Sequence, residues 1–291
     1  MLAIKTDRLT KSYGKQRGIE NLSIEISEGD FFGFIGPNGA GKSTTIRTLL
    51  GFITKNSGSA EIFGMDITEK REHILALTGY LPSEVAYYSG MRVRDMLSLS
   101  ASLRGIDCSA EANALCERLK LDPTQKISSL SFGNRKKVGI IAALQHKPRL
   151  CILDEATSGL DPLMQYEFFE ILKERNRDGA TIFLSSHNLA EIGKHCRSAA
   201  VIREGKILVS DSIENLSCTG VKRVTLRGAS QMPSVNDARN ISTDGDTLSF
   251  LYGGATDGLI KALSSISFYD ITITDPDAEE VFLNYYTGEA R

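Results

Sequence analysis

One segment near the N-terminus restricts the fold of this 291-residue chain more than any other: a glycine-rich loop over residues 36–44. It fits the pattern G-x-x-x-x-G-K-[ST], in which glycines let successive backbone N–H groups turn toward a phosphate. The apolar run 31–35 precedes it, as a buried parallel strand would, and residues 45–50 indicate a helix that ends at Gly51. This order of strand, loop and helix predicts an α/β fold with a triphosphate site. The residues expected around the triphosphate are Gly36, Pro37, Asn38, Gly39, Ala40, Gly41, Lys42, Ser43 and Thr44.

Two side chains of this loop have distinct expected roles. Lys42 places a point charge on the β- and γ-phosphates, and Ser43 offers its hydroxyl to Mg²⁺. The helix that begins here directs its positive end at the same anion. The loop is therefore a charge-matched cradle for a nucleoside triphosphate.

A second apolar strand ends in two acids. Residues 150–153 lead into Asp154 and Glu155, at the carboxyl end of a strand, where α/β sheets bind ligands. Asp154 is expected to hold the metal's water shell, and Glu155 to polarise the attacking water. A strand that merely ends in two exposed acids is the alternative, and the upstream loop favours the catalytic interpretation.

Composition limits the other possibilities. A hydrophobic content of 41% and a charged content of 24% are typical of a soluble globular protein. The net charge of −2 gives no support to a nucleic-acid role, so no nucleic-acid partner is expected. The five scattered cysteines predict reduced thiols in a cytosolic protein and no zinc site. No signal peptide or membrane span is expected, so any membrane role comes through a partner.

The order of elements predicts a mostly parallel sheet with helices packed on it. Residues 1–215 form the expected nucleotide-binding domain, with an inserted helical subdomain at about 85–147, and residues 216–291 form a small α+β accessory domain. Asp275-Pro276 begins an expected last helix. The strands are expected at 2–10, 19–26, 59–63, 79–81, 150–153, 180–184, 199–202, 206–209, 221–226, 247–252 and 268–274, and the other helices at 71–77, 92–103, 110–119, 135–145, 162–175, 188–196 and 257–263.

Four further pieces of sequence give a family resemblance. The stretch Asp154–Pro162 matches a Walker B and D-loop sequence, and Leu130-Ser131-Phe132-Gly133-Asn134 stands where the signature L-S-G-G-Q is expected. Ser185-Ser186-His187 matches a switch histidine after the next strand, and Tyr13 matches an aromatic residue that stacks on adenine. In this order, the motifs resemble the ATP-binding subunits of ABC transporters over residues 1–210.

The resemblance implies a P-loop NTPase of the ABC-ATPase type, which hydrolyses ATP with Mg²⁺. It implies that Glu155 and His187 are catalytic and that Tyr13 binds adenine. It also implies a head-to-tail homodimer with ATP between the subunits, in which Ser131, Gly133 and Asp161 act on the nucleotide of the opposite subunit. The partner would be a membrane permease on a separate chain, which holds this cytoplasmic subunit at the inner face of the cell membrane.

The sequence departs from the family pattern at two places. Ser83 stands where a metal-binding Gln is usual, so either a water bridges the gap or Glu84 substitutes. Phe132 replaces a glycine of the signature, and its side chain must point away from the phosphate; Asn134 replaces Gln. Such variants, and the small C-terminal domain, resemble ATPases that pair with separately encoded exporter-type permeases, which favours export.

Two other functions remain open. A non-transport ABC ATPase that acts on ribosomes or DNA is disfavoured by the single P-loop and the absence of a heptad run. A weakly catalytic nucleotide sensor is suggested by Ser83 and Phe132. Taken alone, Tyr13 and His187 also have ordinary interpretations, as a strand-end tyrosine and a helix-capping histidine. The transported substrate is not encoded here, because its site lies in the permease, and the C-terminal domain carries no motif.

Overall fold

The computed structural model describes residues 1–276, apart from residues 15, 89, 218–220 and 237. The chain divides into two compact units, Met1–Ser210 and Asp211–Arg291. In the described part, no helix is both long enough and apolar enough to cross a membrane.

The first unit contains a six-stranded sheet with the order β11-β10-β4-β9-β8-β7. Register pairs Ile35 with Ser186 and Asp154 with Ser185, so β4, β9 and β8 end at the same edge of the sheet. The glycine-rich loop directly follows β4 and His187 directly follows β9, while Asp154 is the last residue of β8 and Glu155 follows it. The parallel strands are β4 (Phe31–Ile35), β7 (Thr78–Leu81), β8 (Leu150–Asp154), β9 (Thr181–Ser186) and β10 (Ser198–Arg203), and β11 (Lys206–Ser212) follows β10 through a tight turn at 204–205.

A second, antiparallel sheet was not expected from the sequence. Short connections join β1 to β2, β2 to β3 and β5 to β6, and they allow antiparallel pairing but not the long crossover that parallel strands need, whereas β4 and the helix after it lie between β3 and β5. The single strand expected at 19–26 is two strands, since Ser23 and Ile24 lie outside both. The strands of this sheet are β1 (Leu2–Tyr13), β2 (Gln16–Leu22), β3 (Glu25–Ser27), β5 (Ser57–Ile62) and β6 (Met65–Asp66).

Helix α1 (Lys42–Leu49) joins the two sheets into one core. It contacts β8 of the parallel sheet and β2 and β5 of the antiparallel sheet. Ile46 and Leu49 on α1 are fully buried, and burial of each such side chain stabilises the fold by about 1.5–3 kcal/mol. The helix that carries the triphosphate loop is thus fixed on both sides.

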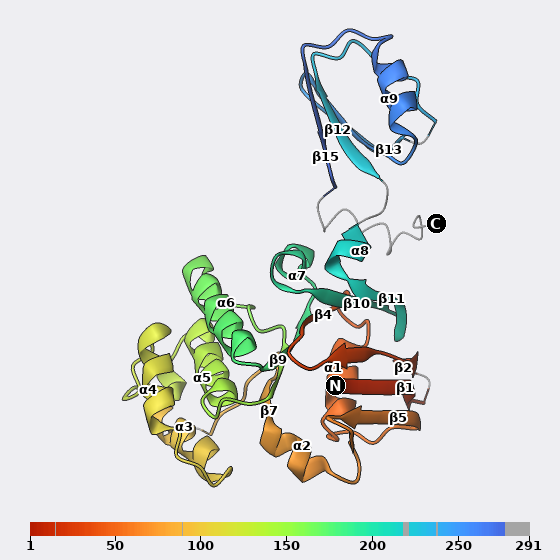
Figure 1. The fold of residues 1–291 in the computed structure, drawn as a ribbon. Coiled ribbons are helices and arrows are strands. Elements are labelled where there is room, and N and C mark those ends of the chain that lie inside the picture. The colour runs from red at the N-terminus through yellow and green to blue at the C-terminus, as the bar shows by residue number, and fades with distance from the viewer. Residues whose placement is uncertain (15, 89, 218–220, 237, 277–291) are drawn as a thin grey trace. The chain divides into compact units, whose positions relative to one another are not determined.

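The helices of the inserted subdomain gather on one side of the first unit (Figure 1). Helix α5 begins at Phe132, three residues earlier than the sequence predicted, because the Ser131 hydroxyl accepts a hydrogen bond from the Asn134 N–H and caps it. The subdomain helices are α3 (Val93–Ser102), α4 (Ser109–Arg118), the short η1 (Ile127–Ser129) and α5 (Phe132–Leu144). Helix α2 (Arg71–Leu77) precedes the subdomain, and α6 (Pro162–Arg177) and α7 (Leu189–His195) follow it.

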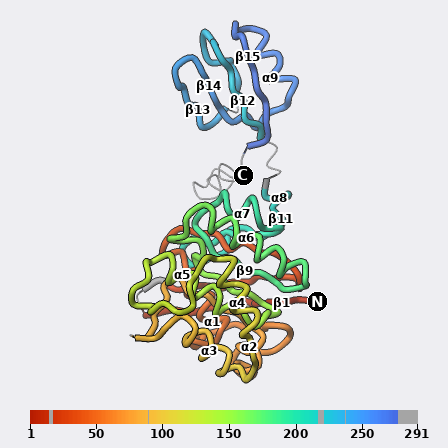
Figure 2. Tube along the Cα trace, turned by 90° about the vertical axis from the view of Figure 1, so that its left-hand side faces the viewer, coloured from red at the N-terminus to blue at the C-terminus, as the bar shows by residue number. Residues whose placement is uncertain are grey.

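The second unit has its own sheet, with the order β13-β14-β12-β15. Helix α9 covers one face, where Leu259 packs with Val224, Leu226 and Phe250 (Figure 1 and Figure 2). Strand β13 was missed because its polar residues are mostly exposed and show no apolar alternation. The last predicted helix lies almost wholly outside the described residues. The elements are α8 (Ile213–Ser217), β12 (Lys222–Arg227), β13 (Ala238–Asp244), β14 (Thr247–Tyr252), α9 (Thr256–Leu263) and β15 (Asp270–Thr274).

Candidate nucleotide site

The loop between β4 and α1 requires its glycines. A Cβ atom on Gly36 would lie 2.6 Å from the carbonyl oxygen of Ile202. Gly41 has a φ of 111°, in a region that side-chain-bearing residues rarely adopt. The glycine positions of the motif are therefore set by backbone conformation and by close packing on β10.

The ammonium group of Lys42 lies across the same loop. Its Nζ donates hydrogen bonds to the carbonyl groups of Gly36, at 2.6 Å, and Pro37, at 3.3 Å. Nζ also forms an ion pair with Oε1 of Glu155 at 3.1 Å. The Lys42 side chain is only 6% exposed, so little solvent weakens this interaction. The loop and the second acid are therefore linked by one buried cation.

Asp154 is held by a hydroxyl on each side. Ser43 Oγ donates to Oδ2 of Asp154 at 2.7 Å, and Ser185 Oγ donates to Oδ1, also at 2.7 Å. Asp154 is 1% exposed. Sequence reasoning did not assign a role to Ser185. The only sequence signal for it was its place near the end of the strand that leads to His187.

The Ser43 and Asp154 pair suits Mg²⁺. Hydroxyl and carboxylate oxygens are ligands that Mg²⁺ prefers, and this ion usually takes one or two protein ligands together with phosphates and water. Among the described residues, no cluster of three or more His, Cys, Asp or Glu side chains could hold a metal ion without such help. The donor set therefore fits a magnesium ion that arrives with a triphosphate.

The two residues predicted to be catalytic lie in direct contact. Nδ1 of His187 is 2.7 Å from Oε2 of Glu155. Glu155 has a left-handed backbone, with a φ of 49°, and its N–H donates to the carbonyl of Ser185 at 3.0 Å. Such a conformation costs energy and persists where the surroundings impose it, often at active sites. The turn after β8 thus directs one carboxylate toward both Lys42 and His187.

A cavity of about 330 Å³ opens beside these groups. Ser83 and Glu155 line it, whereas Glu84 and Tyr13 are not among the lining residues that the structure describes. Tyr13 lies at the end of β1, 43% exposed, with Lys11 Nζ 5.2 Å from its ring centroid. The other lining residues are Gly18, Pro37, Asn38, Gly39, Gly41, Lys42, Ser43 and Thr44.

The signature residues lie apart from this cavity. Of the described residues that line it, none comes from 130–134 or from the D-loop beyond Glu155. Phe132 is 51% exposed, and a Cβ on Gly159 would lie 2.4 Å from its ring, which places the ring against the D-loop. Gly133 is equally close, since its own Cβ would lie 2.4 Å from the Gly159 carbonyl oxygen. Asp161 caps α6 by accepting from the Met164 N–H at 3.0 Å.

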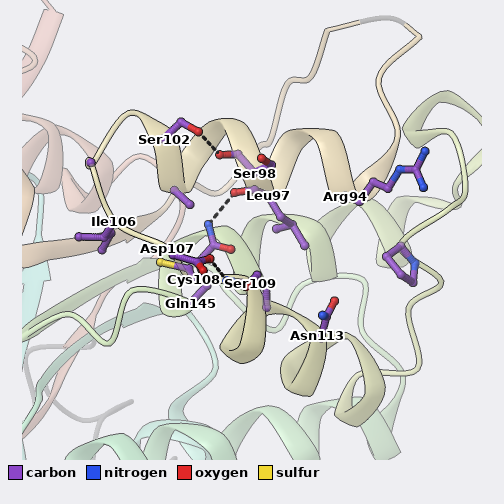
Figure 3. A pocket seen from close by; sticks show the side chains of 14 residues that line it. Arg94, Leu97, Ser98, Ser102, Ile106, Asp107, Cys108, Ser109, Asn113 and Gln145 are labelled. Carbon is purple, nitrogen blue, oxygen red and sulfur yellow. Dashed lines mark hydrogen bonds between the residues drawn. The ribbon is translucent and has the colours of Figure 1, made fainter.

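A larger cavity, of about 470 Å³, lies in the helical subdomain (Figure 3). Gln145 closes part of it and donates from Nε2 to the Leu97 carbonyl at 3.0 Å. The cavity shares no residue with the predicted nucleotide site. Its described lining residues do not include Lys42, Ser43 or Glu155. The size of a cavity alone therefore does not identify the functional site.

Comparison with known proteins agrees with this geometry. Residues 19–158 match the ABC transporter family. The chain is 39% identical over 222 residues to the bacitracin transport ATP-binding protein BcrA of Bacillus licheniformis, covering 73% of this chain and 71% of the relative. It is 26% identical to the linearmycin resistance ATP-binding protein LnrL of Bacillus subtilis (strain 168), over 97% of both chains.

A solved ATP-binding subunit of an ABC transporter superposes with a TM-score of 0.69 at 28% identity, covering 74% of this chain and 91% of that one. The chain belongs to the ABC transporter ATP-binding proteins, the ATP-hydrolysing subunits of these transporters. The resemblance seen in the motifs is thereby confirmed, as is the P-loop NTPase fold.

Proposed function

We propose that two copies of this chain bind ATP and Mg²⁺ head-to-tail and drive export through a permease on a separate chain. One observation carries the composite site. Lys42, Ser43 and Glu155 line the P-loop cavity, and Asp154 is bonded to Ser43 behind it, whereas Ser131 and Gly133 are not among its described lining residues. A site that uses the signature residues on a γ-phosphate therefore needs them from a second copy.

Within one copy, we assign Glu155 as the general base and His187 as the group that orients it. Glu155 Oε1 is paired with Lys42, but a lysine binds phosphate as a point charge, and a γ-phosphate carries more negative charge than one carboxylate. Once the phosphate takes Lys42, Glu155 can accept the proton of the attacking water. The bond between His187 and Oε2 keeps the carboxylate directed at that water. Magnesium, held by Ser43 and Asp154, would neutralise charge on the phosphates.

The second copy supplies the other half of the site. Ser131 caps α5, and the positive end of this helix is suited to an anion. Gly133 lacks a side chain, so its backbone can approach a phosphate closely. Asp161 lies at the start of α6 and is assigned to the contact between the copies. ATP then joins the copies when it binds and releases them when it is hydrolysed.

Export is supported by the relatives, which are named for bacitracin transport and linearmycin resistance. We place the permease contact at a cavity of about 380 Å³ with a mostly apolar lining, which combines helical-subdomain residues such as Val85 and Ala86 with Phe52, Leu75 and Tyr80 from outside it. Pro82, which also lines it, directly precedes Ser83 of the nucleotide cavity. A permease segment bound here therefore lies next to the nucleotide. This location accounts for a cytoplasmic subunit held at the inner face of the membrane.

Capture of the tagged chain from detergent-solubilised membranes of its own organism tests this function. The chain should retain one multi-spanning membrane protein, and Ala86→Asp should lose it, because the carboxylate would have to leave water for a contact that is mostly apolar, even with Arg104 on the cavity wall. Ala110→Asp, on an exposed position of α4 outside this cavity, is the matched control. Capture of ribosomes or DNA in place of a membrane protein would reject the proposal.

A further inference from the structure

Lys136 is a buried lysine that the mechanism above does not use. It lies on α5, five residues after Ser131, and is only 1% exposed. Its Nζ donates to the carbonyl groups of Pro82, at 3.1 Å, and Ser83, at 2.8 Å. Among the described residues, no carboxylate forms an ion pair with it. Burial of an ammonium group whose hydrogen-bond partners are two backbone carbonyls costs free energy, and burial of a neutral side chain at this position would cost less.

The position of Lys136 beside the nucleotide cavity gives a reason for this free-energy cost. Ser83 lines the nucleotide cavity, so the carbonyl that Lys136 holds belongs to a residue at the cavity wall. Burial lowers the pKa of Lys136 to about 8, while the negative charges of Asp154 and Glu155 raise it. The ammonium therefore lies within electrostatic reach of both catalytic acids, although it touches neither.

Other contacts attach residues 82–87, the segment that contains Pro82 and Ser83, to α5. The hydroxyl of Tyr87 donates to the carbonyl of Arg135 at 2.8 Å. A Cβ on Gly139 would lie 2.8 Å from Leu81 Cδ1 and 2.9 Å from Val85 Cγ1, so the helix and the segment are in close contact. The N-terminal half of α5 is therefore attached at several points to the segment that follows β7. Ser131 caps this half of the helix, and Gly133 lies in it.

We propose that Lys136 is a positioning residue that transmits nucleotide binding at Ser83 to the signature residues Ser131 and Gly133 of its own chain. This inference rests on the proposed composite site. Ser83 shifts when the cavity fills, and the hydrogen bonds of Lys136 move α5 with it. Ser131 and Gly133 then reach the position at which they meet the nucleotide of the second copy. Lys136 is not among the described residues that line the nucleotide cavity, so it is assigned no direct contact with ATP.

The experiment measures ATP-dependent pairing in a Glu155→Gln background, in which ATP should bind without turnover. Sedimentation gives the pairing affinity, and titration with a fluorescent ATP analogue gives nucleotide affinity. Lys136→Met, which removes charge and donors at similar length, should weaken pairing about tenfold and leave nucleotide affinity within about twofold. Lys136→Gln, which keeps one donating group, should weaken it by less, about threefold.

Lys126→Met is the matched control. Lys126 lies in the same helical subdomain and its replacement makes the same change of charge and length, but it is exposed and no hydrogen bond or ion pair joins its side chain to another described residue. Its variant should pair like the parent. Parent-like pairing of Lys136→Met, or an equal loss of nucleotide affinity, would overturn the inference. Should Lys136→Met not fold, parent-like pairing of Lys136→Gln would overturn it. Absence of pairing in the Glu155→Gln parent would instead refute the composite site.

Discussion

At the scale of single residues, the site is built from contacts between positions far apart in the chain. Ser43 meets Asp154, and Glu155 meets both Lys42 and His187. The motifs predicted these residues because each carries chemistry that a triphosphate site needs. Ser185 and Lys136 were not predicted, since a serine or lysine has no distinctive pattern until its partner is known. Their partners, Asp154 and the carbonyl of Ser83, lie 31 and 53 residues away.

The role of Glu155 leads to the first prediction at this scale. Glu155→Gln keeps the shape of the side chain but removes the proton acceptor, so steady-state phosphate release should fall by about 10²–10⁴-fold. Equilibrium binding of ATP should persist, since the loop groups around Lys42 are unchanged.

Glu84→Gln is the control for this variant. Glu84 is exposed and is not among the described residues that line the nucleotide cavity, so its variant should turn over ATP at the parental rate. A Glu155→Gln protein that releases phosphate at the wild-type rate would show that another group activates the water. A loss of turnover in Glu84→Gln would instead assign a metal role to that residue.

At the scale of elements, the parallel sheet brings the site residues together because β4, β8 and β9 end at the same edge. Most of these strands and helices were predicted, some to the residue, as for α2 and β14. The antiparallel sheet was not, because alternation of apolar residues predicts a strand without specifying which neighbour it pairs with. The early start of α5 depends on the Ser131 cap, which the apolar pattern of the helix does not reveal.

The contact between β7 and α5 gives a prediction at this scale. A Cβ on Gly79 would lie 2.1 Å from the backbone carbonyl oxygen of Ala143, which cannot rotate away. Gly79→Ala should therefore separate β7 from α5 and lower the free energy of unfolding by about 1–3 kcal/mol. Gly139→Ala meets the ends of flexible side chains at 2.8 Å or more, so it should cost less. Denaturant unfolding of both variants checks the order, and a larger loss for Gly139→Ala would contradict it.

At the scale of the whole molecule, the chain contains two compact units, and under the proposed function one copy supplies only part of a complete site. The P-loop and the signature segment both belong to the first unit, and among the described residues the lining of the P-loop cavity includes none from 130–134. The sequence alone could not establish this separation, because it depends on how α5 packs against β7 and the 82–87 segment. The family resemblance implied it, and the lining of the cavity agrees with it.

Mixing two inactive variants tests this central claim most directly. Lys42→Ala disables the P-loop, and Ser131→Arg blocks the signature side, so each protein alone should hydrolyse almost no ATP. Mixed equally, half of the dimers would pair an intact P-loop with an intact signature at one site, which predicts about a quarter of the wild-type rate. Phosphate release that stays at the sum of the two separate rates, or a Ser131→Arg protein that is fully active alone, would contradict the head-to-tail site.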